Sequence, residues 1–350
     1  MSEGANKQKI FISLDGGGTR GLMTIQILSH LEKELGRNIG DLCDIIAGTS
    51  AGGIISFCKM NGIDNELINE LYKCVGKKVT KFNCSNFTES QSIANTNLLI
   101  EELSKLFSGN IKDFAKHRKG FVLTCLSPTL LPIDYRAYMI SNYDNDNRFY
   151  MEPKKMLDIS VVDSIRATSG IPLLFNVPRY QGKNFLDGGY LNNNPTPILY
   201  QEAISLFGGE NSKDFIFISI GTGRKPTTNF SSKLIAGAKL PFKYSNTIVN
   251  NLTGIELDSP IHRIVNFMTS SGEESHLQFK NAHPDLSYFR FDTYIDKDIA
   301  VNDASDETIE YMKKSTNDYL NSDECKKLIS DLKKLIILKK KKKKKKKNVF

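Results

Sequence analysis

Short apolar runs alternate along the chain with longer segments in which apolar residues recur at helical spacing. The runs predict strands at 9–14, 43–47, 121–126, 185–186 and 215–220. The helical spacing predicts helices at 22–35, 53–58, 63–76, 98–107, 160–168 and 306–338. This alternation favours an α/β fold of three layers, α/β/α, with a mainly parallel central sheet and helices on both faces. Segments 83–97 and 142–147 are rich in polar residues and predict loops, whereas 227–300 gives only mixed short signals.

Four of the predicted strands end in turns that carry polar residues or glycine. Asp15, Ser50, Asp187 and Gly221 each come just after an apolar run. In open α/β sheets, sites form at the carboxyl ends of the parallel strands. We therefore expect these positions to share one edge of the sheet and to form one site.

The size and composition are those of an ordinary globular protein. The 350 residues are 40% hydrophobic and 25% charged, and no apolar run approaches the roughly 20 residues of a membrane span. The first nine residues are polar, so we expect no secretory signal. The six cysteines show no C-x-x-C spacing, which favours reduced thiols in an intracellular protein, without a bound metal. The expected location is the cytoplasm.

The positive charge is concentrated in one run at the end of the chain. Without the nine lysines Lys339–Lys347, the net charge of +8 falls to −1, so a general nucleic-acid-binding fold is not supported. Before the run, an apolar stripe is flanked by further lysines at helical spacing, with Leu328, Leu332, Leu335 and Ile336 as its members. Residues 326–350 are consistent with a basic amphipathic helix and tail on an anionic membrane surface. A helix packed on the domain with a solvated tail is equally compatible, and a nuclear-localisation signal is less favoured.

The segment Gly48–Gly52 has the pattern G-x-S-x-G between a predicted strand and a predicted helix. Such a turn holds the serine hydroxyl, here that of Ser50, exposed, and its glycines let the backbone turn sharply. The following helix directs free N–H groups and its positive dipole end toward the place where negative charge develops in acyl transfer. Ser50 is therefore a candidate nucleophile.

The loop Asp15–Gly21 offers a place to bind negative charge. Its glycines fit G-x-G-x-x-G after a strand and before a helix, a pattern that also cradles the pyrophosphate of a dinucleotide. That use needs an acidic residue at the end of a second strand, whereas Glu34 and Asp41 both precede the next strand. A row of backbone N–H groups for an oxyanion fits the same loop, and a simple tight turn remains open.

A serine nucleophile also needs a base. None of the five histidines adjoins a glycine turn, whereas Asp187 directly precedes Gly188 and Gly189. An exposed aspartate with a pKa near 3.9 is a poor base toward an alcohol, and burial would raise that pKa. An aspartate that only bonds its own turn is the alternative for this residue considered alone.

Taken together, these blocks resemble the patatin-like phospholipase family. The resemblance spans about residues 9–224, in the order of the family's motifs: Asp15–Gly21, Gly48–Gly53, Arg166–Pro172, Asp187–Pro195 and Ser219–Gly223. It implies that region 9–224 is the catalytic part and that 225–325 completes the same α/β domain. The pattern of apolar residues and lysines itself marks 326–350 as the basic amphipathic helix and tail.

The resemblance implies a Ser-Asp dyad, with Ser50 as nucleophile and Asp187 as base. The oxyanion donors would be Gly16, Gly17 and Gly18, with Arg20 supporting their loop. It further implies cleavage of glycerolipid acyl esters through an acyl-enzyme, of phospholipase A or lysophospholipase type, without calcium or another cofactor. Acyl transfer to an alcohol or lysolipid, a catalytically idle lipid-binding protein and, least favoured, a nucleotide-binding oxidoreductase remain as alternatives.

Overall fold

The computed structural model describes residues 8–79, 94–130, 134–172, 174–224, 260–300 and 302–347. Its strands are β1 (Lys9–Leu14), β2 (Ile45–Thr49), β3 (Lys119–Ser127), β4 (Arg136–Ser141), β5 (Arg179–Tyr180), β6 (Lys183–Asp187), β7 (Phe215–Ile220) and β8 (Ser287–Phe291). They form one sheet in the order β5-β6-β3-β2-β1-β7-β8, with β4 paired to β3. Pairing is parallel from β3 through β2, β1 and β7 to β8, whereas β4, β5 and β6 run antiparallel to their neighbours.

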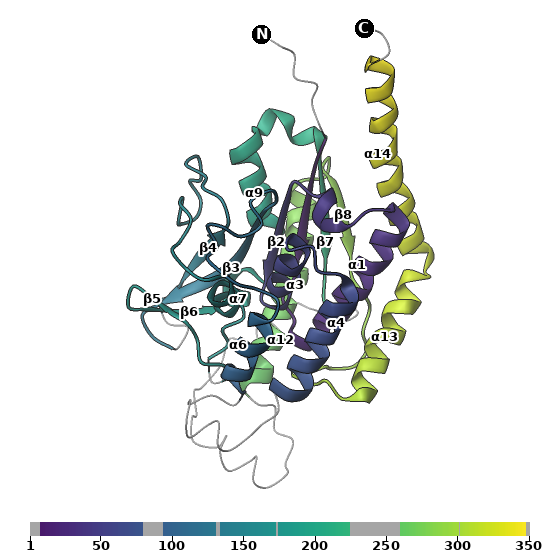
Figure 1. The fold of residues 1–350 in the computed structure, drawn as a ribbon. Coiled ribbons are helices and arrows are strands. Elements are labelled where there is room, and N and C mark those ends of the chain that lie inside the picture. Colours follow the sequence, from purple (N-terminus) through teal and green to yellow (C-terminus); the bar gives the residue numbers. More distant parts are fainter. Residues whose placement is uncertain are drawn as a thin grey trace.

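The longer helices are α1 (Gly21–Leu35), α3 (Ala51–Met60), α4 (Asn65–Cys74), α6 (Thr96–Ser104), α7 (Val161–Thr168), α9 (Thr196–Phe207), α12 (Pro260–Ala282), α13 (Asp306–Leu320) and α14 (Asp323–Lys347). The short helical segments are η1 (Gly18–Arg20), α2 (Ile39–Leu42), η2 (Val75–Val79), α8 (Gly189–Asn192) and η3 (Gly209–Asp214). Figure 1 shows the sheet enclosed between helices, with α1 and α13 side by side on one side of it.

The sheet buries both of its faces, which gives the three layers that the pattern predicts. Along β1, Ile10 and Ile12 belong to a core shared with α1, α3 and α13, whereas Phe11 belongs to a second core shared with α9. Successive side chains of a strand point to opposite faces, so a continuous apolar run is the pattern of a strand that is covered twice. The fold class expected from the sequence is thus confirmed.

Most predicted strands and helices are present, with bounds shifted by a few residues. Gly36 ends α1 in the left-handed conformation, as expected for a helix C-terminus. The continuous helix predicted over 306–338 is wrong, because α13 ends at Leu320 and the Ser322 hydroxyl then accepts the N–H of Cys325 at the start of α14. The apolar pattern did not predict α9, β4, β5 and β8. Residues 83–93 of the predicted loop 83–97 lie outside the described residues, and α6 already begins at Thr96. Residues 227–259 also lie outside them.

The apolar stripe near the end of the chain packs on the domain. Leu332 is fully buried in the core, Leu328, Leu335 and Ile336 are partly buried against it, and Lys333 pairs with Glu34 of α1. Of the two interpretations of this helix, the structure favours the packed one for residues 323–336, because the stripe is already covered.

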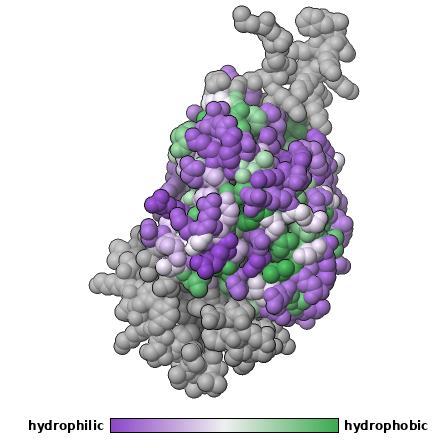
Figure 2. Space-filling view, turned by 60° about the vertical axis from the view of Figure 1, so that its left-hand side comes forward, coloured by the Kyte–Doolittle hydropathy of each residue, from purple (hydrophilic) through white to green (hydrophobic). Residues whose placement is uncertain are grey.

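The face of the molecule seen in Figure 2 is largely polar. On the face shown in Figure 2, hydrophilic residues predominate and hydrophobic ones are visible in small groups. No helix in the described part of the chain combines the length and hydrophobicity needed to cross a bilayer. Five of the cysteines are free thiols, and Cys84 lies outside the described residues.

Candidate active site

Ser50 and Asp187 are brought together by two strands that meet end to end along β3. β2 pairs with the first half of β3, so that Thr49 lies opposite Leu123, and β6 pairs in the opposite direction with the second half, so that Asp187 lies opposite Thr124. Because β4 occupies the other side of β3, β2 and β6 lie on one side and run toward each other. Their last residues are therefore neighbours, although they are far apart in the sequence.

The backbone at Ser50 has the sharp turn that the G-x-S-x-G pattern predicts. Ser50 has φ 52° and ψ −121°, a conformation that side chains rarely adopt, and it begins α3. A Cβ at Gly52 would lie 2.2 Å from the carbonyl oxygen of Leu14, and one at Gly48 would lie 2.3 Å from that of Gly52. Glycine is required at both positions because the turn packs against backbone.

Thr168 at the end of α7 connects the serine turn to the aspartate turn. Its hydroxyl accepts the Ser50 N–H at 2.9 Å and donates to the Leu123 carbonyl at 2.5 Å, while its carbonyl accepts the N–H of Gly188 at 3.1 Å. Thr168 belongs to Arg166–Pro172, one of the segments that carry the family resemblance. Its place between the two turns was not foreseen, because it depends on the packing of α7.

Asp187 is buried and only partly hydrogen-bonded. Its Oδ1 accepts the N–H of Gly189 at 2.7 Å, whereas Oδ2 has no partner of normal hydrogen-bond geometry. Burial raises the pKa of Asp187 from 3.8 to about 6, and the neighbouring Ser50 hydroxyl and the Gly189 N–H counteract part of this rise. The carboxyl group thus has the basicity of a general base that works near neutral pH.

The glycine loop lies against the serine turn. A Cβ at Gly16 would lie 3.1 Å from the Cβ of Ser50. The Gly16 N–H donates to the Asn193 carbonyl at 3.2 Å, and is therefore already used. The N–H groups of Gly17 and Gly18 donate to no protein acceptor among the described residues, so these two donors remain available to a ligand.

Arg20 lies behind this loop. Its side chain is buried, its N–H donates to the Gly17 carbonyl, and the nearby carboxylates of Asp292 and Asp298 oppose the lowering of its pKa to about 10 by burial. It is not among the described residues that border the pocket at Ser50. This position fits a supporting residue of the loop.

A pocket with mainly apolar walls opens at Ser50 and Gly18. Its other described lining residues come from η1, α3, α4, η2, α6 and the segment after α7: Thr19, Ala51, Ile54, Leu71, Tyr72, Val75, Leu99, Leu103, Ser169, Ile171, Leu174 and Phe175. No histidine is among them. The pocket was not predicted, because its wall joins residues from segments without a common motif.

None of the histidines that the structure describes borders the pocket, and two of them, His276 and His283, contact aromatic residues instead. Nδ1 of His276 lies 2.8 Å from the Tyr288 hydroxyl, and the ring of His283 packs on those of Tyr200 and Phe279. Burial lowers the pKa of His276 to about 3. No cluster of three or more potential metal ligands occurs in the part of the chain that the structure describes.

The relatives found by comparison with known sequences are named phospholipases. The chain is 24% identical over 327 residues to human calcium-independent phospholipase A2-gamma, which covers 90% of this chain and 38% of that protein. It is 26% identical to patatin-like phospholipase 1 of Plasmodium falciparum, over 88% of this chain and 47% of that protein. It is 27% identical to a cGAMP-activated phospholipase of Escherichia coli, over 60% of this chain and 61% of that protein.

The chain thus spans about two fifths to one half of the length of the first two of these relatives. Among solved structures, VipD from Legionella pneumophila aligns with 93% of this chain and 67% of its own, at a TM-score of 0.43 and 12% identity. The family model for patatin-like phospholipases matches residues 12–200, more than half of the chain and all of the segment from the glycine loop to Asp187. The chain therefore belongs to the patatin-like phospholipase family.

Proposed function

We propose that this chain hydrolyses the acyl esters of glycerolipids through an acyl-enzyme formed on Ser50. The observation that carries the proposal is the apolar pocket that begins at the Ser50 hydroxyl beside a buried carboxylate of raised pKa. An acyl chain fits such a pocket because its burial is favourable along its whole length. The names of the related proteins, all phospholipases, support the same substrate class.

The proposed reaction uses the two side chains in turn. Asp187 accepts the proton of Ser50 as the serine oxygen attacks the ester carbonyl, and the oxyanion is held by the N–H groups of Gly17 and Gly18. The leaving alcohol takes the proton back from Asp187, which leaves the acyl group on Ser50. Asp187 then removes a proton from water as the water oxygen attacks the acyl-enzyme carbonyl. It passes this proton to the serine oxygen as the fatty acid leaves, which restores both the Ser50 hydroxyl and the Asp187 carboxylate.

A fluorophosphonate probe tests this proposal directly. We expect the probe to label Ser50, as located by mass spectrometry of the labelled peptide, because an activated serine is what such probes modify. Release of fatty acid from vesicles of mixed glycerolipids should fall in proportion to labelling. Labelling at another residue, or full hydrolysis by fully labelled protein, would contradict the proposal. Acyl transfer instead of hydrolysis would appear as new acylated lipids in the same assay.

We further propose that Lys339–Lys347 draws the protein to anionic membranes. The remainder of the chain is close to neutral, so this run is its main concentration of positive charge. Each basic residue near an anionic surface contributes about 1 kcal/mol, so even two lysines in contact strengthen binding about 30-fold. The apolar stripe before the run is packed on the domain, so charge, and not insertion of that stripe, carries the attraction.

Truncation after Leu338 tests this proposal, because it removes the lysines and keeps the packed part of α14. We expect weaker binding to vesicles with anionic lipid at low salt, measured by co-sedimentation, and a smaller difference at high salt because of screening. Hydrolysis of a soluble short-chain ester should be unchanged. A full-length variant with the nine lysines replaced by glutamine controls for length. Equal binding by all three proteins would exclude a membrane role for the run.

A further inference from the structure

Arg290 of β8 lies in register with residues of β7 and β1, the two strands that end at the turn of Gly221 and at the glycine loop. In register across three neighbouring strands, Arg290 lies beside Ser219 of β7, and Ser219 lies beside Ser13 of β1. The Arg290 side chain is only 8% exposed. A buried guanidinium is costly unless its donors are paired, so its partners indicate what it holds in place.

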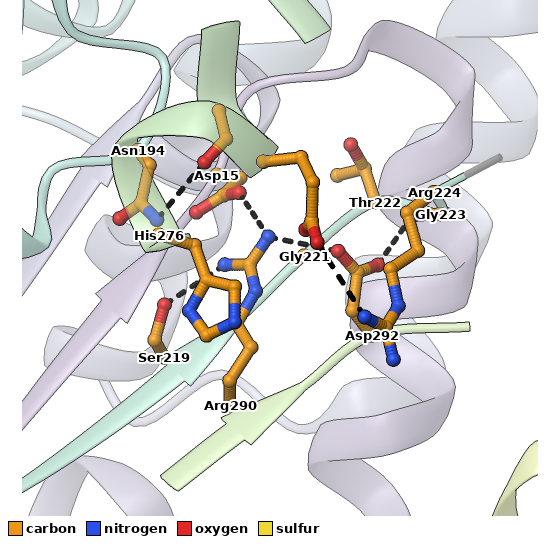
Figure 3. A network of polar contacts seen from close by, with 12 residues as sticks. Asp15, Asn194, Ser219, Gly221, Thr222, Gly223, Arg224, His276, Arg290 and Asp292 are labelled. Carbon is orange, nitrogen blue, oxygen red and sulfur yellow. Dashed lines mark hydrogen bonds and ion pairs between the residues drawn. The ribbon is translucent and has the colours of Figure 1, made fainter. Parts of the chain in front are cut away.

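Those partners are two carboxylates and a hydroxyl. Arg290 Nη2 lies 2.7 Å from Oδ2 of Asp15 and 2.8 Å from Oδ2 of Asp292, and Nη1 donates to the Ser219 hydroxyl at 2.8 Å. Figure 3 shows the guanidinium between these groups. Both carboxylates are almost fully buried, so Arg290 is the centre of a buried ionic cluster.

The first connection from this cluster to the glycine loop is Asp15 itself. Asp15 directly precedes Gly16, and its backbone N–H donates to the Ile220 carbonyl at the end of β7. The backbone of Asp15 is therefore fixed by the sheet, and its side chain by Arg290. Burial raises the pKa of Asp15, and the Arg290 guanidinium opposes that rise, so the ion pair favours the charged carboxylate.

The second connection passes through Asp292. Its Oδ1 accepts the N–H of Gly223 at 2.8 Å, which fixes the turn after β7. From that turn, the Thr222 hydroxyl donates to the Gly16 carbonyl at 2.8 Å. A Cβ at Gly17 would lie 2.3 Å from the same hydroxyl oxygen. The second connection thus ends at the carbonyl of the peptide unit that carries the Gly17 N–H, and the first ends at Asp15, directly before Gly16.

We propose that Arg290 is a positioning residue for the oxyanion loop, acting through Asp15 on one side and through Asp292 and Thr222 on the other. This inference rests on the proposed function, in which the N–H groups of that loop bind the oxyanion. Arg290 and Asp292 lie beyond residues 12–200, the part of the chain that the family model matches. Through these two residues, β8 at the end of the sheet is connected to the glycine loop beside Ser50.

The test compares Arg290→Gln, Arg290→Lys and Asp15→Asn with the wild-type protein. On a soluble short-chain ester, we expect Arg290→Gln to lose about 10²-fold in kcat with little change in KM, because small misplacement of donors costs transition-state stabilisation and not ground-state binding. Arg290→Lys keeps the charge and should recover part of this loss. Fluorophosphonate should finally label the same fraction of Arg290→Gln as of the wild-type protein, because that fraction measures how many molecules are folded. The labelling should be slower, because its rate depends on the position of the oxyanion loop.

Arg148→Gln is the matched control. Arg148 and Glu202 form another fully buried ion pair, and neither borders the pocket. This variant should lose stability but keep the wild-type kcat per labelled molecule. Should Arg290→Gln fail to fold, Asp15→Asn, which keeps the size of the side chain, decides by the same comparison.

Wild-type kcat per labelled molecule in Arg290→Gln, or in Asp15→Asn where that variant decides, would overturn the positioning role. So would an equal loss in Arg148→Gln. Failure of the proposed function is a different result, because the wild-type protein itself would then neither label at Ser50 nor release fatty acid.

Discussion

Ser50→Ala is expected to abolish ester hydrolysis while the protein stays folded. The substitution removes the only atom that would form the acyl-enzyme, and loss of a serine nucleophile costs on the order of 10⁴–10⁶ in kcat. The Ser50 hydroxyl does not cap α3, and alanine keeps the hydrogen bond from the backbone N–H of this residue to the Thr168 hydroxyl. We therefore expect a change in stability within about 1 kcal/mol.

The measurement is hydrolysis of a soluble ester and of vesicle lipid, at matched purity and with thermal unfolding as a check on the fold. Ser56→Ala is a matched control, because Ser56 is a buried serine of the same helix whose hydroxyl donates to the Gly53 carbonyl. It should keep its activity. If Ser50→Ala retained more than about a few per cent of the wild-type rate, Ser50 would not be the nucleophile.

The local parts of the site could be predicted from the sequence because each is encoded within a few neighbouring residues. Gly48 and Gly52 mark the turn at Ser50 because a side chain at either position would collide with backbone. The rule that parallel strands present their carboxyl ends at one edge then places Asp15 and Ser50 together. These predictions needed no knowledge of which distant segments touch.

The pairing between distant strands could not be predicted, even where its result was. Asp187 was expected beside Ser50 as the end of a parallel strand, but it reaches Ser50 because β6 runs antiparallel along the second half of β3. A run as short as Phe185-Leu186 contains no information on its direction. The raised pKa of Asp187 is likewise a result of burial, and the degree of burial cannot be read from the neighbouring glycines. The same holds for the apolar pocket, whose wall is assembled from separate helices.

The region after Gly223 was the least predictable. Ser287–Phe291 contains three aromatic residues, which favour a strand, but it also contains Arg290, which the pattern of an apolar strand does not predict. The structure gives the reason for this arginine, since two buried carboxylates surround it. Leu332 shows a second limit of sequence analysis. An amphipathic stripe has the same pattern whether it faces a membrane or its own domain, and the sequence alone does not distinguish the two.

Asp187→Asn is expected to be nearly as damaging as loss of the serine, whereas no single histidine substitution should be. Removal of a general base costs of order 10²–10⁴ in rate. Asparagine keeps the size of the side chain and can still accept the Gly189 N–H, so the turn should survive. The histidine variants are the natural controls, because His276 and His283 pack on tyrosine and phenylalanine rings away from Ser50. A folded histidine variant without turnover would replace the dyad with a triad.

The pH dependence separates a base from a residue that merely holds the turn. Asp187 acts only as the carboxylate, so the activity of the wild-type protein should rise as pH increases through about 6 and level off above it. An aspartate with the pKa of a free side chain would place this rise about two units lower, near 4. In Asp187→Asn the residual activity should lack the rise near pH 6, because the titrating group is gone. Profiles of kcat/KM on a soluble ester measure both proteins, and a rise near 6 that persists in Asp187→Asn would assign the base to another group.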